Sequence, residues 1–156
     1  MHVESSIELI ARPDVVMLDL AATSRDSALR TLHAELARQP GVTDGELFLK
    51  DMLERVGLAP VCIATDVALP HARTTAVERI VLGVGRLAAP GVGFDGDHPN
   101  VRLMFMIGTP RQHVEEYLKL VAALSRLLRK TGAREALIQA PNETEFRALL
   151  ARGAHR

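Results

Sequence analysis

The chain has 156 residues, a length typical of one domain that buries its own core without disulfides or metals. Nineteen Lys and Arg residues balance nineteen Asp and Glu residues, so the formal net charge is zero and no overall field attracts nucleic acid or an anionic membrane. With four Phe, one Tyr and no Trp, the chain has few aromatic side chains on which bases or sugars could stack. We therefore expect an aliphatic core and no nucleic-acid partner.

The single cysteine, Cys62, excludes an intrachain disulfide and any zinc site built from several cysteines. It suits a reducing compartment, and its apolar neighbours favour a buried, structural thiol. No apolar run approaches the ~18 residues of a membrane span, and the amino terminus carries Glu4 and Glu8 instead of a basic region and an apolar run. The sequence predicts a soluble, cytoplasmic protein with no membrane insertion.

The first sixty residues predict one strand and two helices. A strand is expected over Val15–Leu20, and Thr23–Asp26 supplies the N-cap of a helix that Pro40 and Gly41 end. Thr43–Glu46 has the pattern of a capping box, which begins a second helix with Arg55 near its end. Each helix has apolar residues at 3.6-residue spacing: Ala28, Leu29, Leu32 and Leu36 in the first, and Leu47, Phe48, Met52, Leu53 and Val56 in the second.

Three apolar runs in the middle of the chain predict a sheet. Val61–Leu69 is rich in β-branched residues and favours a strand with a turn, and Arg79–Leu87 alternates weakly between apolar and other residues. Residues 91–100 predict a loop in which Val92 and Phe94 could form a short edge strand. Val101–Ile107 is almost wholly apolar, as in a central strand that is covered on both faces.

The remaining residues predict helices. Gln112–Lys130 is the strongest helical pattern, a short helix over Ala133–Gln139 follows, and Asn142 caps a last helix that Gly153 ends. The apolar face of the long helix consists of Val114, Tyr117, Leu118, Val121, Leu124 and Leu128. No repeat or low-complexity linker divides the chain, so residues 1–156 are expected to form a single layered α/β domain with a mixed sheet of four or five strands.

The most informative motif is Ala68–Arg73, which places His71 at the end of an apolar run. Pro70 fixes its own φ and favours extended geometry at Leu69, so the backbone that carries the histidine is stiff. A histidine with a pKa near 6.5 is partly neutral at cytoplasmic pH, and a neutral ring nitrogen can accept a phosphoryl group. From these residues alone, a histidine that caps a turn is the other interpretation.

Arg55 precedes His71 by sixteen residues, and the turn at 57–60 could fold the helix end back so that both side chains share one cleft. A guanidinium neutralises phosphoryl oxygens through a planar fork of donors. An exposed arginine that interacts with the helix dipole fits the local sequence equally well.

Other candidate residues carry weaker signals. His113, near the start of the long helix, is more typical of a surface histidine. No histidine stands in an HxxxH or HxH pair, and Asp95–His98 is explained more simply as a polar turn than as a metal loop. Motifs for nucleotide binding and for serine hydrolases are absent, so we expect no cofactor, no metal and no metal-dependent hydrolase.

Taken in order, the residues of the motif resemble a known family. Glu54-Arg55, Val67–Arg73, Phe94–Gly96, the apolar strand up to Pro110 and the helix Glu116–Leu128 resemble the type-2 (fructose/mannitol-class) enzyme IIA domain of the bacterial phosphotransferase system. The stand-alone nitrogen-regulatory branch is similar in size. The resemblance spans about residues 15–150 and implies a mixed sheet with helices on both faces. It also implies that His71 accepts phosphate and that Arg55 is the active-site arginine.

The sequence departs from the family pattern at several positions. Val56 stands where the family usually has Glu, and Val61, Cys62, Ala64 and Asp66 replace a Ser/Thr-Gly pair and a glycine-rich turn. The family usually also has a second histidine in its long helix. Here Tyr117 takes that place; its hydroxyl can donate a hydrogen bond but carries no positive charge. His113 lies one helical turn earlier.

Two functions follow from the resemblance. In the first, the protein accepts a phosphoryl group on His71 from an HPr-type phosphohistidine protein, and passes it to an enzyme IIB domain or signals with it. In the second, the missing polar residues leave a binding module without efficient phosphotransfer, which regulates a transporter or a sensor kinase by docking. Arg55, His71 and Tyr117 are the predicted site residues.

Overall fold

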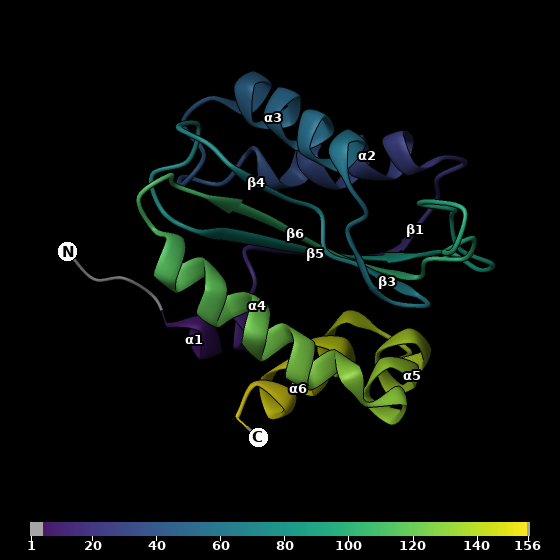
Figure 1. Ribbon diagram of the computed structural model, residues 1–156. Coiled ribbons are helices and arrows are strands. Elements are labelled where there is room, and N and C mark those ends of the chain that lie inside the picture. Colours follow the sequence, from purple (N-terminus) through teal and green to yellow (C-terminus); the bar gives the residue numbers. More distant parts are fainter. Residues whose placement is uncertain (1–4, 156) are drawn as a thin grey trace.

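In the computed structural model, which describes residues 5–155, a mixed β-sheet lies between two layers of helices (Figure 1). The strands are β1 (Val15–Leu20), β2 (Cys62–Ala64), β3 (Val67–Ala68), β4 (His71–Arg73), β5 (Val81–Leu87) and β6 (Leu103–Thr109). The helices are α1 (Ser6–Ala11), α2 (Arg25–Leu36), α3 (Gly45–Leu58), α4 (Val114–Arg129), α5 (Thr131–Gln139) and α6 (Glu143–Ala154). The predicted α/β class with a mixed sheet is confirmed.

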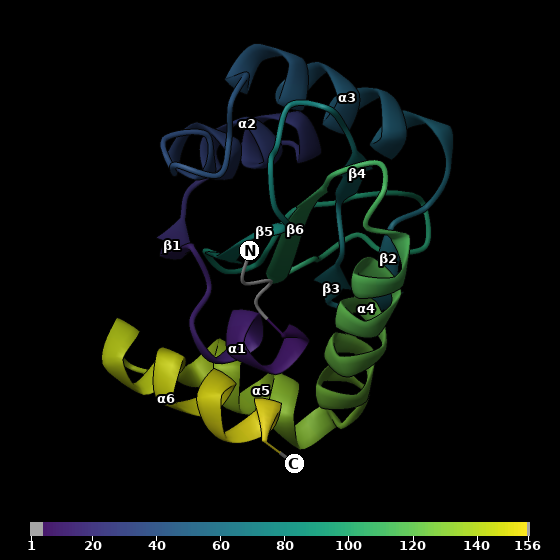
Figure 2. The same cartoon turned by 90° about the vertical axis from the view of Figure 1, so that its left-hand side faces the viewer.

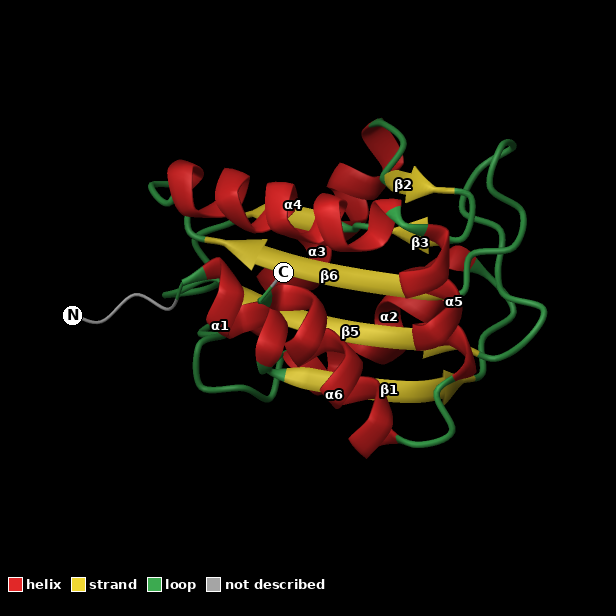
Figure 3. Cartoon of the chain, turned by 90° about the horizontal axis from the view of Figure 1, so that it is seen from below, coloured by secondary structure: helices red, strands yellow, loops and turns green. Residues whose placement is uncertain are grey.

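The strands follow the order β1-β5-β6-β3-β2, and β4 also pairs with β6 (Figure 3). β5 and β6 are antiparallel, whereas β1 is parallel to β5, and β3 and β4 are both parallel to β6. The sheet has six strands instead of four or five because the run Val61–Leu69 folds into the antiparallel pair β2 and β3, and because His71–Arg73 is a strand of its own.

Helices cover both faces of the sheet, as expected. α2 and α3 pack on one face through a cluster that includes Leu32, Phe48 and Met104. α1, α4, α5 and α6 cover the other face through Phe105, Leu124 and other buried residues (Figures 1 and 2). β5 and β6 are buried along their whole length, which explains why the run over residues 101–107 is continuously apolar.

The N-caps of the predicted helices agree with the sequence at α2 and α6 and differ at α3. Ser24 accepts a hydrogen bond from the backbone N–H of Ser27, and Asn142 accepts one from that of Glu145. At α3 the cap is Asp44 instead of Thr43, because the Thr43 hydroxyl donates to the carbonyl of Ala76. The last helix continues to Ala154, so Gly153 does not end it.

Two features of the helical layers differ from the expectation. α1 was not predicted at all; six residues give too little periodic signal, although Ser5 caps it. The buried stripe of α4 runs along Leu120, Leu124 and Leu128. Val114 and Leu118, which were assigned to the apolar face, are exposed by 39% and 57%. Within residues 5–155, no helix is both long and apolar enough to span a membrane.

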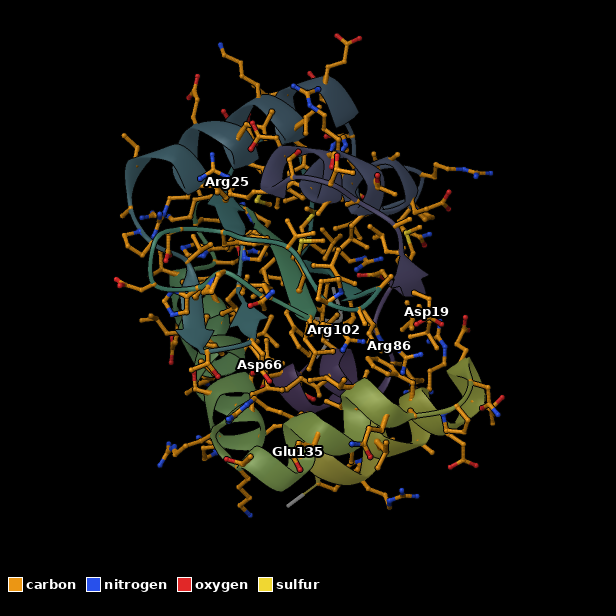
Figure 4. All side chains as sticks on the ribbon, turned by 90° about the vertical axis from the view of Figure 1, so that its right-hand side faces the viewer. Asp19, Arg25, Asp66, Arg86, Arg102 and Glu135 are labelled. Carbon is orange, nitrogen blue, oxygen red and sulfur yellow. The ribbon has the colours of Figure 1, made fainter. Side chains whose placement is uncertain are left out.

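The buried side chain of Arg86 connects the sheet to the carboxyl-terminal helices. Its Nη1 donates to the carbonyls of Leu137 and Ala140, at 3.0 and 2.7 Å, and its Nη2 lies 3.2 Å from Oδ1 of Asp19. Figure 4 shows Arg86 and Asp19 beside each other near these helices. The guanidinium also lies 5.8 Å from the ring centroid of Phe146. One side chain thus satisfies the carbonyls at the end of α5.

We expect Arg86→Ala to lower the free energy of unfolding by at least about 2 kcal/mol, because each of the two buried carbonyls that lose their donor costs about 1–3 kcal/mol. Asp19→Asn is the matched control. Its carboxylate is 69% exposed, so losing its charge should cost under about 1 kcal/mol. Urea denaturation of the three proteins measures both values, and equal losses in the two variants would contradict the role assigned to the carbonyl contacts.

Candidate functional site

Backbone pairing holds His71 in place. His71 pairs with Ile107 in the parallel ladder between β4 and β6, and the N–H of Ile107 donates to the carbonyl of Pro70 at 2.9 Å. On the other side of the proline, the N–H of Leu69 donates to the carbonyl of Val61 at 2.8 Å. The histidine was predicted where a strand ends in a turn. It lies instead within a short strand, so its Cα is fixed by hydrogen bonds as well as by the stiffness of Pro70.

The hydrogen bond of His71 assigns its tautomer. Nδ1 lies 2.8 Å from the carbonyl oxygen of Leu69. Because a carbonyl only accepts hydrogen bonds, Nδ1 must carry the hydrogen, and the neutral ring then has its free electron pair on Nε2. The side chain is therefore in the tautomer that reacts through Nε2.

His71 lines a surface cavity of about 300 Å³. The predicted residues Arg55 and Tyr117 line the same cavity, so the three side chains that the sequence singled out come together. The other lining residues are Asp51, Glu54, Leu58, Ala72, Arg73 and Arg111. α3 supplies one wall, α4 supplies another, and β4 forms the floor between them.

Arg55 is in the last turn of α3, which continues to Leu58. Its Nη1 lies 3.4 Å from the carbonyl oxygen of Ala59, which is a long hydrogen bond to the residue that ends the helix. The predicted turn at 57–60 therefore begins later than expected, because Gly57 and Leu58 are still helical, but Arg55 and His71 line one cavity as the sequence analysis suggested.

The environment of His71 favours the neutral imidazole. Burial has the largest effect and lowers the pKa of His71, because the charged ring loses hydration. The hydrogen bond to Leu69 raises the pKa, and the positive charge of Arg55 lowers it again; the net change is a decrease. A histidine that accepts a phosphoryl group must be unprotonated at the attacking nitrogen, so these contacts favour the reactive form near neutral pH.

Tyr117 contacts His71 through its ring. The two ring centroids are 5.4 Å apart and the rings are tilted by 38°. Among the hydrogen bonds of residues 5–155 none joins these two side chains, so the expected hydrogen bond to the imidazole is not present in this state. Burial raises the pKa of Tyr117 while Arg55 lowers it, and the phenol stays protonated as a donor. The predicted proximity is therefore found, in the form of ring packing.

Sequence reasoning missed the charged residues around the predicted three. Arg73 was quoted in the motif without a role, and its Nη2 donates to the carbonyl of Arg111 at 3.2 Å, which links β4 to the segment before α4. Asp51 and Glu54 also line the cavity. The spacing gave one available signal: Asp51 and Arg55 are four residues apart and therefore share a helix face.

His113 stands at the N-cap position of α4 but is not among the residues that line the cavity. Its side chain makes no capping hydrogen bond, and its Nδ1 is buried without a hydrogen-bond partner. The place of the second histidine is thus filled by Tyr117 and not by His113.

The polar turn Asp95–His98 forms as predicted. Oδ1 of Asp95 accepts from the N–H of Asp97 and lies 2.7 Å from Nδ1 of His98. Cys62 is half-buried, not fully buried, because β2 is at the edge of the sheet. Its thiol lies beside Asp95 and His98, a proximity that the sequence did not indicate.

With this geometry in view, comparison with known proteins gives a family. Residues 9–153 match the family described as "Phosphoenolpyruvate-dependent sugar phosphotransferase system, EIIA 2". The chain belongs to this family. The predicted resemblance to type-2 enzyme IIA domains is thereby confirmed, and with it the phosphocarrier or regulatory class of protein.

Two relatives show the range of the EIIA family. The fructose-specific EIIA component of Haloferax volcanii is 31% identical over 149 residues, which cover 94% of this chain and 96% of the relative. A nitrogen regulatory protein of Pseudomonas aeruginosa is 26% identical and covers 86% of this chain and 88% of its own length. The EIIA chain is thus similar to a sugar-specific component and to a regulatory protein.

Solved structures agree on the fold. The nitrogen regulatory protein IIA-Ntr of Neisseria meningitidis superposes with a TM-score of 0.78 at 20% identity, over 90% of this chain and 94% of that one. The mannitol enzyme IIA of Escherichia coli, in a complex with phosphorylated enzyme IIB, gives a TM-score of 0.72 at 23% identity, over 88% of this chain and 94% of that one.

The burial and charges of the site predict a lowered titration midpoint for His71. His71 should titrate below the usual 6.5 of a histidine, because burial and Arg55 both disfavour the imidazolium. Arg55→Gln removes one of these causes and should raise the midpoint, so that the ring is protonated at a higher pH than in the wild type. Nuclear magnetic resonance of the imidazole carbons measures both midpoints. Arg126→Gln, on the last turn of α4, is the control and should leave the midpoint unchanged.

Proposed function

We propose that the protein is a phosphohistidine carrier that accepts a phosphoryl group on Nε2 of His71. The observation that carries this proposal is the hydrogen bond from Nδ1 to Leu69, which leaves the electron pair on Nε2 of a partly buried imidazole inside a cavity with three arginines. Phosphoryl transfer depends mainly on positioning and on charge stabilisation, and this arrangement provides both.

The transfer needs few protein groups. Nε2 of His71 attacks the phosphorus of a phosphohistidine in the donor protein, a new N–P bond forms, and the N–P bond of the donor breaks with its electron pair returning to the donor ring. Nδ1 keeps its hydrogen and its bond to Leu69, which stabilises the positive charge that develops on the His71 ring. No cofactor or metal takes part in this step.

Arginines are suited to hold the transferred group. Arg55, Arg73 and Arg111 line the cavity with His71, and a guanidinium can bind two phosphoryl oxygens at once. Asp51 and Glu54 line the same cavity, so the cationic groups exceed the anionic ones by a single charge. A phosphoryl dianion is therefore bound without a large positive surface that would attract other polyanions.

The proposed partners follow from the family. An HPr-type phosphohistidine protein is the proposed donor, and an enzyme IIB domain, a transporter or a sensor kinase is the proposed receiver. The support for a IIB partner is that a mannitol enzyme IIA with a similar fold forms a complex with phosphorylated enzyme IIB. With these partners, the proposed location of the protein is the cytoplasm.

A phosphorylation assay tests the proposal directly. With a phosphoenolpyruvate-driven donor relay, the wild type should acquire one acid-labile phosphate, and His71→Gln should acquire none because the accepting nitrogen is gone. His113→Gln is the matched control, since this histidine lies outside the cavity lining, and it should be labelled normally. An unlabelled wild type beside a competent enzyme IIA would refute the proposal.

Tyr117 provides a second test. Tyr117→His should prolong the phosphohistidine or speed its formation about ten-fold, because a charge-assisted hydrogen bond is worth roughly 1.5–3 kcal/mol. Tyr117→Phe removes the hydroxyl and should reduce the stability of the phosphohistidine. Rates of labelling and of hydrolysis for the three proteins give the comparison, and identical rates would mean that Tyr117 serves packing alone.

A docking role without efficient transfer is the second candidate function. It is favoured by Tyr117 in the place of a second histidine, and by the apolar side chain of Leu58, which is 82% exposed and lines the cavity. In this case His71→Gln should bind the partner as tightly as the wild type does, whereas Leu58→Glu should weaken binding. Binding constants measured by titration calorimetry distinguish the two functions.

A further inference from the structure

Away from the cavity, three metal-ligating side chains converge at the edge of the sheet. Cys62 is the first residue of β2, whereas Asp95 and His98 belong to the loop before β6 and form an isolated antiparallel bridge. One ligand atom of each residue lies within 4.8 Å of the others. All three side chains are half-buried, so the group is neither closed off nor fully solvated.

We infer that Cys62, Asp95 and His98 form a binding site for a single zinc ion. Thiolate, imidazole and carboxylate are the three ligand types that Zn²⁺ takes in proteins, and the thiolate disfavours Mg²⁺ and Ca²⁺. Bonds of about 2.0–2.3 Å in a tetrahedron require ligand atoms roughly 3.5 Å apart. The three ligand atoms lie within 4.8 Å of one another, and Nδ1 of His98 and Oδ1 of Asp95, which are 2.7 Å apart, must separate slightly to admit the ion. Three protein ligands leave the fourth position to water.

Zinc must displace the proton of the Cys62 thiol. Burial, and after it the carboxylate of Asp95, raises the pKa of this thiol to about 11, so without a metal the sulfur keeps its proton. On binding, the S–H bond breaks, a Zn–S bond forms, and one proton passes to the solvent.

His98 can bind the ion by giving up its hydrogen bond to Asp95. In the present state its Nδ1 lies 2.7 Å from Oδ1 of Asp95, so a hydrogen joins two atoms that could both bind zinc. When the ring hydrogen moves to Nε2, the ion can replace it between Nδ1 and the carboxylate. The N–H of Asp97 continues to hold Oδ1 of Asp95 and fixes the orientation of the carboxylate.

The site would connect the edge hairpin that leads to the candidate phosphorylation site with the loop before β6. Cys62 pairs with Ala68 across the β2–β3 hairpin, and the chain continues through Pro70 to His71. Asp95 and His98 lie in the segment 92–101, which is closed by the bridge between Val92 and Val101. Zinc would join this segment to the edge strand and restrict the hairpin.

Metal titration tests the site independently of phosphotransfer. Protein freed of metal with a chelator should bind one Zn²⁺ per chain, and Co²⁺ in its place should give the absorption band of a thiolate-to-cobalt charge transfer. Cys62→Ser should abolish this band and weaken zinc binding by more than the roughly 10–100-fold that loss of an outer-shell partner costs. Asp95→Asn, which keeps the shape of the side chain, should also weaken binding.

Two control variants distinguish zinc binding at this site from zinc binding at other histidines. His71→Gln and His113→Gln should bind zinc as the wild type does. If Cys62→Ser does not fold, His98→Gln replaces it; there, zinc should no longer protect the Cys62 thiol from alkylation, whereas in the wild type it should. The inference is overturned if the wild type binds less than one zinc ion per chain, if Cys62→Ser or His98→Gln retains wild-type affinity, or if His71→Gln loses it.

Discussion

The pairing of β6 with three other strands holds the short strand that carries His71. One edge of β6 bonds to β5, and the other edge bonds first to β3 and then to β4. Pro70 stands between these two short strands, where the proline has no N–H and its carbonyl accepts from Ile107. Two strands of two and three residues would be too short to persist alone, but the buried β6 holds both.

The same pairing explains why a histidine can be partly buried without a charged partner. The backbone that carries His71 cannot move toward solvent without breaking the ladder to Ile107 and its neighbours. Its imidazole is therefore held at a depth where hydration is incomplete, and a neutral ring with one hydrogen bond to Leu69 is the stable form. Arg55 acts in the same direction as burial, so the neutral state does not rely on a single contact.

The long helices and strands could be predicted from the sequence, whereas the short ones could not. β1 and the central strand were predictable because each is a mostly apolar run of six or seven residues, and the cap residues Ser24 and Asn142 marked two helix starts. β4 and α1 have three and six residues, too few for any period to be visible, and both form because the tertiary structure pairs or covers them.

Some residues of the site could likewise be predicted from the sequence, and others could not. His71 and Arg55 were predictable because one motif and one spacing carry them, and Tyr117 because the family pattern gives its place. Arg111 lies far from the motif in sequence, and Cys62, although it is only six residues before Ala68, is separated from Asp95 by 33 residues; neither has a local pattern of its own. Only the folded chain brings these residues to their partners. Arg111 lies at the cavity because its carbonyl accepts a hydrogen bond from Arg73, and Cys62 lies beside Asp95 and His98 because its edge strand is next to their loop.

The position of the cavity between helices of opposite layers has one more consequence. Arg55 comes from α3, on one face of the sheet, and Tyr117 comes from α4, on the other. Their separation is therefore fixed by the thickness of a packed sheet and not by the conformation of a loop. A site with walls on two rigid layers keeps its width when surface loops move, so an incoming anion meets donors that are already in place and little energy is spent on rearranging them.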